Sequence, residues 1–149
     1  MVSILDVALW FLSKSEMTHK KLQKLCYYAQ AWHWALFNSP MFNENFEAWV
    51  HGPVNRTLYS SYAYYGWRKI PQQNFNEEQL PDDVLDILNA VYDTYGDFSG
   101  DQLEALTHSD LPWQKARGSL KPWETCTAII SDDDMHDYYI KQYEQAQQD

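Results

Sequence analysis

The stretch Lys21–Leu36, KLQKLCYYAQAWHWAL, decides the fold of this chain. At about 100° per residue, six of its side chains fall on one narrow stripe. They are Leu22, Leu25, Cys26, Ala29, His33 and Leu36. Thr18 can accept a hydrogen bond from a backbone N–H of the first turn, and Pro40 disfavours helical geometry in the residue before it. The sequence therefore predicts an amphipathic central helix that is capped by Thr18 and stops at Asn38.

Further helices are predicted on both sides of this stretch, because apolar residues recur at helical spacing between capping residues. We expect them at Ile4 to about Leu12, from Pro53 to Gly66, from about Pro81 to Tyr95, from Ser99 through Leu106, at Leu111–Arg117, and after Ser131. Pro53 is expected in the first helical position, where its missing N–H is tolerated.

Two segments look non-helical. The alternation in Phe46–Val50 predicts a short extended piece, and Trp67–Asn74 is expected to be a polar loop. We therefore expect a mainly α fold of about six or seven helices with at most a minor β element. Residues 1–149 should form a single compact domain, with a polar tail that is frayed after about residue 144.

The net charge of −10 is unevenly distributed. Residues 1–76 contain four acids and seven bases, whereas residues 77–149 contain seventeen acids and four bases. Such an acidic half repels phosphate backbones and attracts basic proteins, although it also serves plain solubility. Two basic groups, Lys20, Lys21 and Lys24 with His19, and Lys115 and Arg117 with Lys121, are small against so much acid. We expect nucleic-acid binding to be the weaker alternative.

The N-terminus lacks the positive region and the small-residue cleavage site of a signal peptide, and Asp6 interrupts it. Its longest strongly apolar run, Val7–Leu12, is far too short to cross a bilayer. Cys26 and Cys126 stand in no motif, and the sequence leaves a single disulfide open. We expect a cytoplasmic protein that does not contact a membrane.

Catalytic and cofactor motifs are missing from the sequence. Cys26 and His33 share a helix face, but seven residues separate them by roughly 10 Å, too far for a nucleophile and its base. No Gly-rich phosphate loop or zinc-type spacing is present. The acids of 132–137 cluster around His136, but their place at a helix start is explained by capping and the helix dipole. We predict no catalytic residue, no metal and no cofactor.

Three motif blocks follow one another in the chain. The first is the Lys-Leu-Gln-Lys-Leu entry with Tyr-Tyr-Ala-Gln and Trp-His in 21–33. The other two blocks contain Trp49, His51, Gly52, Pro53, Thr107, His108, Pro112, Trp113 and Arg117. Together, across about residues 20 to 117, they resemble the Panacea antitoxin domain family, which includes SocA-like proteolytic adaptors and phage-associated GepA-type proteins. The motif residues look structural first, since Gly52 and Pro53 fix a turn and the tryptophans are large apolar fillers.

The resemblance implies a non-catalytic role. Members of this family neutralise toxins by direct binding, and SocA-like members hand the toxin to a protease. We therefore expect an antitoxin with a cognate, basic toxin as partner; a proteolytic adaptor and a DNA-binding regulator are the alternatives. The candidate interface residues are the aromatics Tyr27, Trp34, Tyr59, Tyr64, Tyr65 and Trp67. The alternative for each is that a second layer of helices covers it.

Overall fold

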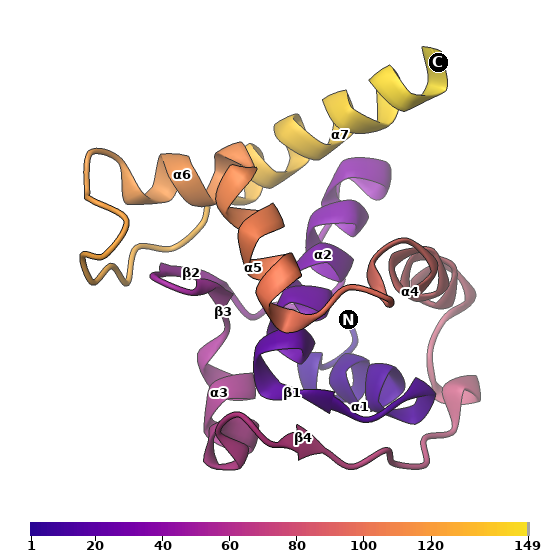
Figure 1. Ribbon diagram of the computed structural model, residues 1–149. Helices are drawn as coiled ribbons and strands as arrows, with labels where there is room; N and C mark the ends of the chain where they lie inside the picture. The colour runs from indigo at the N-terminus through magenta and orange to yellow at the C-terminus, as the bar shows by residue number, and fades with distance from the viewer. Residues whose placement is uncertain (149) are drawn as a thin grey trace.

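The centre of the structure is helix α2 (His19–Phe37), which the other elements surround in a computed structural model that describes residues 1–148 (Figure 1). The Thr18 hydroxyl accepts a hydrogen bond from the backbone N–H of Lys21, and Asn38 ends the helix in the left-handed conformation at φ 52°. Both predicted ends of the helix are confirmed. Every side chain from residue 22 to residue 31 is buried, so α2 is covered all the way round rather than along one stripe.

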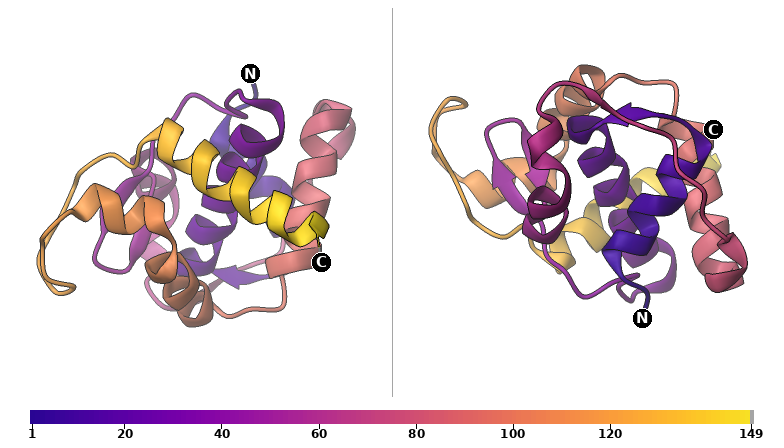
Figure 2. Two further views of the ribbon diagram at one scale, coloured as in Figure 1. Left: turned by 90° about the horizontal axis from the view of Figure 1, so that it is seen from above. Right: turned by 90° about the horizontal axis from the view of Figure 1, so that it is seen from below.

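The fold is mainly α, as predicted. The other helices are α1 (Ile4–Lys14), α3 (Arg56–Tyr62), α4 (Asp82–Tyr95), α5 (Gly100–Ser109), α6 (Leu111–Arg117) and α7 (Asp132–Gln148). Two single turns of 3-10 helix are η1 (Ala63–Tyr65) and η2 (Glu77–Gln79). The strands are β1 (Met17–Thr18), β2 (Glu47–Trp49), β3 (Gly52–Val54) and β4 (Lys69–Ile70). Figure 2 shows α7 crossing α2 on one side of the molecule and α1 covering it on the other.

The strand pair β2–β3 corrects one prediction. Pro53 lies in β3 opposite Ala48, not in the first turn of a helix. Helix α3 begins only at Arg56, after Asn55 has capped it by accepting from the N–H of Leu58. A proline, which has no N–H, is tolerated at a strand edge as well as at a helix start. In this protein the pairing of β3 with β2 places Pro53 in a strand.

The loop predicted at Trp67–Asn74 also contains regular structure. Lys69 and Ile70 form β4, which pairs antiparallel with β1, the strand that directly precedes α2 in the chain. Ile70 is buried, so this short strand closes the core at the N-terminal end of α2. A two-residue strand has no period of its own, which is why the sequence did not indicate it.

Helix α4 follows the prediction closely. Its buried side chains are Val84, Ile87, Leu88, Val91 and Tyr95, the stripe expected from the spacing. Ser99 and Gln102 form a capping box at the start of α5, where a helix was predicted from Ser99. Both cysteines are free and buried.

Helix α7 is anchored by a buried aspartate at the junction of α5 and α6. Asp110 accepts hydrogen bonds from the hydroxyls of Tyr28 on α2 (3.0 Å), Tyr138 (3.2 Å) and Tyr139 (2.7 Å) on α7. Burial raises the pKa of this carboxyl, and the three hydroxyls oppose that shift. The helix continues to Gln148, beyond the point where we expected a frayed tail, and Asp149 lies outside the described residues.

Candidate partner-binding surface

Residues from the three motif blocks meet beside the N-terminal half of α2. Lys24 of α2 donates a hydrogen bond from Nζ to the carbonyl oxygen of Pro53 in β3 (3.2 Å). Gly52 has a φ of +104°, and a Cβ at this position would lie 2.7 Å from Lys24 Cε and 3.0 Å from Thr107 Oγ1. The absent side chain of Gly52 therefore lets helix α2, strand β3 and helix α5 approach one another closely.

The Lys24 ammonium is buried in this junction. Burial lowers the pKa of Lys24 to about 7, with Glu104 acting in the opposite direction and Lys20 adding to the shift. A buried lysine with so low a pKa can mark a reactive amine. Here the side chain is sealed beneath β3, because only 1% of Lys24 is exposed. Lys24 therefore links α2 to β3 and is not accessible to a substrate.

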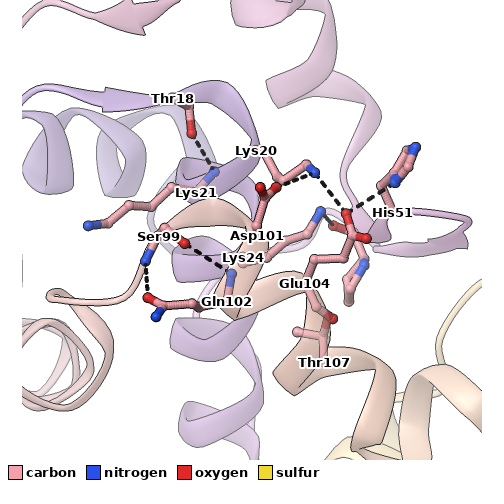
Figure 3. A network of polar contacts seen from close by, with 11 residues as sticks. Thr18, Lys20, Lys21, Lys24, His51, Ser99, Asp101, Gln102, Glu104 and Thr107 are labelled. Carbon is pink, nitrogen blue, oxygen red and sulfur yellow. Dashed lines mark hydrogen bonds and ion pairs between the residues drawn. The ribbon is translucent and has the colours of Figure 1, made fainter. Parts of the chain in front are cut away.

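A charged network covers Lys24 at the surface (Figure 3). Lys20 Nζ pairs with Glu104 Oε1 at 2.8 Å and with Asp101 Oδ1 at 2.9 Å, and His51 Nδ1 lies 3.1 Å from the same Glu104 oxygen. Partial burial opposes both shifts, but the pairing raises the pKa of Lys20 and lowers that of Glu104. These residues hold the first turns of α2 and α5 at a fixed separation, with the His51 ring exposed to solvent.

The third motif block packs behind the β2–β3 hairpin. Trp113 donates its indole N–H to the carbonyl oxygen of Trp49 (2.9 Å), and the ring of His108 stacks on Trp113 with centroids 4.0 Å apart. Burial lowers the pKa of His108, although Glu104 and a backbone hydrogen bond at Val50 act against the shift. Pro112, buried in the first turn of α6, completes this packing.

Arg117 joins the hairpin to the loop that precedes α7. Its guanidinium donates to the carbonyl oxygens of Ala48 (2.8 Å), Lys121 (3.0 Å) and Glu124, and it lies over the Trp113 ring at 4.9 Å. One planar group with several donors thus satisfies carbonyls from two separate segments. With Arg117, every motif residue named from the sequence except the exposed His51 is placed within the packed structure.

Four of the predicted interface aromatics border this region. Tyr59, Tyr64, Tyr65 and Trp67 form what we call the aromatic surface. Tyr59 is exposed and packs on Trp49 with ring centroids 5.1 Å apart, and the exposed Tyr64 stacks on the half-buried Tyr65 at 4.4 Å. Trp67 is 87% exposed and lines a hollow of about 450 Å³ with Lys20 and Asp101 of the charged network.

The other two predicted interface aromatics lie elsewhere. Tyr27 is fully buried between Tyr28, Phe46 and Tyr139, so its assignment to an interface is wrong. Tyr27 is not part of the apolar stripe predicted for this helix, but neighbouring segments cover that side of α2 as well. Trp34 is half-buried farther along α2 and does not join the aromatic surface.

The ion pair between Lys20 and Glu104 is not predictable from the sequence. Lys20 stands among basic residues that also suit a phosphate contact, and Glu104 stands in no motif. One signal was available, because Glu104 precedes the motif residue Thr107 by three positions and so shares its helix face. Its partners lie far away in the chain, and only the tertiary structure brings them together.

Across residues 1–148, no helix is both long and apolar enough to span a membrane. The same residues contain no group of three histidine, cysteine, aspartate or glutamate side chains arranged to hold a metal ion.

Comparison with known proteins gives one match. No curated protein and no solved structure is similar enough to this chain to count as a relative. Residues 22–114 match the family described as antitoxin SocA-like, Panacea domain. The matched segment begins within α2, includes the hairpin and ends in α6, so it contains Lys24, Gly52 and Thr107, which meet beside α2, and ends before Arg117. The chain belongs to the SocA-like antitoxin family with a Panacea domain.

Proposed function

We propose that this protein is an antitoxin that neutralises a protein toxin in the cytoplasm by binding it directly. Family membership supports the class of function. The observation that carries the binding mode is the aromatic surface, where Trp67 is 87% exposed beside the charged network. Tryptophan and tyrosine are the side chains that most often dominate binding energy at protein interfaces.

The hollow beside Trp67 is suited to binding because its opposite wall is firm. Trp67 lies in the turn between η1 and β4, and across the hollow are the first turns of α2 and α5, which Lys20 ties together through Asp101 and Glu104. A fixed wall loses less entropy on binding than a free loop. We therefore assign the first contact with the toxin to Trp67 and Tyr64.

The partner is expected to be basic. Residues 77–149 carry seventeen acids and four bases, and they form α4, α5 and α7 on the outside of the molecule. Such a field attracts a positively charged protein and accelerates the encounter.

The test uses the purified antitoxin and the product of the toxic reading frame transcribed with it. Trp67→Ala should weaken binding by about tenfold or more, since central aromatic contacts contribute about 2 kcal/mol or more each. Trp123→Ala is the matched control, because Trp123 is 74% exposed in the distant segment 118–131. Both variants should keep the melting temperature. Equal affinities of the two variants would contradict the assignment.

A proteolytic adaptor is the second candidate function, and one observation favours it. An adaptor needs a second binding surface, and the segment before α7 exposes Leu120, Trp123 and Ile129. In the adaptor case, Trp123→Ala would still bind the toxin but would no longer support its degradation by an ATP-dependent protease. Toxin held inactive in a two-protein mixture without protease would favour direct neutralisation alone.

A further inference from the structure

A groove with apolar walls lies between α2, α4 and α7. It is lined by Trp32 and Leu36 of α2, Ala90, Val91 and Thr94 of α4, and Tyr143 of α7, and has a volume of about 210 Å³. Leu36 is sixteen residues beyond Lys20, which puts the groove about 24 Å along α2 from the charged network. It is therefore separate from the aromatic surface.

The rim of the groove exposes large apolar side chains. Leu36 is 41% exposed and Tyr143 is 39% exposed, with the exposed Phe37 next to Leu36. The walls contain no charged side chain, and their one aliphatic hydroxyl, on Thr94, is exposed. Such walls suit apolar side chains of a partner better than a polar small molecule.

The groove is acidic mainly along α4. Helix α4 carries four aspartates and no base, and on α7 Glu144 is next to the groove residue Tyr143, whereas the other four acids of α7 lie at 132–137 near its start. Asp86 and Asp93 lie four residues before and three residues after Ala90, so they sit beside it on the surface of α4. Both are exposed. An apolar trough with acidic edges matches a helix that is apolar on one face and basic at its borders.

We propose that this groove binds a basic amphipathic helix of the partner protein, which under the proposed function is the toxin. The toxin would then be held at two separate places, the aromatic surface and this groove. A second copy of the chain is disfavoured as the occupant, because the acidic edges of two copies would repel each other.

The first experiment needs no toxin. The probe is a labelled synthetic helix with leucines on one face and lysines on the other, compared with an otherwise identical glutamate peptide by fluorescence polarisation. Ala90→Arg places a positive charge inside the groove and should weaken binding of the lysine peptide by about tenfold relative to Asn89→Arg. Asn89 and Ala90 are both exposed on α4, but only Ala90 lines the groove. The two variants have the same net charge, and arginine is a good helix former, so both should fold.

The outcomes separate this inference from the proposed function. Equal affinities of the Ala90→Arg and Asn89→Arg variants for the lysine peptide, or no preference over the glutamate peptide, would overturn the groove as a basic-helix site. A wild-type dimer that Ala90→Arg dissociates would assign the groove to a second copy and overturn it as a basic-helix site as well.

In the second experiment the toxin replaces the peptide. Loss of toxin binding in Trp67→Ala but not in Ala90→Arg would leave the proposed function standing and remove the groove. Peptide binding that depends on the groove, without any toxin binding, would keep the groove as a basic-helix site and remove the proposed function.

Discussion

Gly52 is the residue on which the meeting of the three motif blocks depends. Its φ of +104° is one that side-chain-bearing residues rarely adopt, and its α-carbon faces Lys24 and Thr107. Gly66 also has a positive φ, +61°, but no atom lies within 4 Å of the place where its Cβ would be. Substitutions at these two glycines therefore distinguish the cost of backbone strain, which both share, from the cost of steric collision, which arises at Gly52 alone.

We expect Gly52→Ala to destabilise the protein more than Gly66→Ala. Backbone strain costs about 1 to 3 kcal/mol at either position. At Gly52 the collision with Lys24 and Thr107 adds about 1 to 3 kcal/mol. Urea unfolding of both variants measures the difference. Equal losses of stability would show that the junction yields to a methyl group.

The low pKa of Lys24 predicts how the free energy of unfolding depends on pH. Because burial lowers its pKa to about 7, the unfolded chain binds one proton more than the folded chain between this value and the usual lysine pKa of 10.5. Stability contributed at this site therefore rises as the pH rises from about 7. Compared with the wild type, Lys24→Met should show a slope of unfolding free energy against pH that is smaller by up to about 1.4 kcal/mol per pH unit.

This slope is measured by urea unfolding between about pH 7.5 and about pH 9, where unfolded tyrosines remain mostly protonated. Lys141→Met is the control, since Lys141 is exposed on α7 and should leave the slope as it is. A slope unchanged by Lys24→Met would mean that Lys24 keeps its charge in the folded protein.

At the level of elements, α7 depends on Asp110 for its position against α2. Asp110→Ala would leave the buried Tyr28 hydroxyl without its acceptor and would remove the shorter hydrogen bond of the buried Tyr139 hydroxyl, which keeps only its contact with Tyr27. We expect a loss of about 3 kcal/mol or more, together with faster amide hydrogen exchange in α7 than in α4. Asp86→Ala, at an exposed position of α4, should stay within about 0.5 kcal/mol of the wild type. Amide hydrogen exchange that becomes faster by the same factor in α7 and α4 would contradict an anchoring role of Asp110.

Elements with strong local signals were predictable from the sequence. Thr18 and Asn38 gave both ends of α2, and the spacing in α4 gave its buried stripe. The hairpin was only half recognised, because Pro53 suits both a helix start and a strand edge. Its partner in the sheet, Ala48, decides between the two, and that pairing is not local.

The candidate site was predictable only where no later segment covers the side chain. Tyr59, Tyr64 and Trp67 are exposed as expected, whereas Tyr27 is buried partly by α7, which comes much later in the chain. Periodicity reports which face of a helix is apolar, but not how many neighbours enclose it. The groove beside Leu36 was invisible for the same reason, since three helices form it.

At the scale of the whole molecule, the charge distribution predicts how toxin binding responds to salt. If the acidic half steers a basic toxin, the association rate should fall by about tenfold or more from low to high ionic strength. Stopped-flow association at several salt concentrations measures this. Trp67→Ala should instead raise the dissociation rate and leave the salt dependence of association unchanged. An association rate that does not respond to salt would exclude a strongly basic partner.

The complete enclosure of α2 has a consequence for biosynthesis. Tyr27 and Tyr139, whose hydroxyls lie 3.2 Å apart, are 112 residues apart in the chain. While the ribosome is still translating the segments between them, the central helix α2 has no cover on that side. The nascent chain is then exposed to chaperones and proteases, and it reaches its folded form only after α7 has emerged.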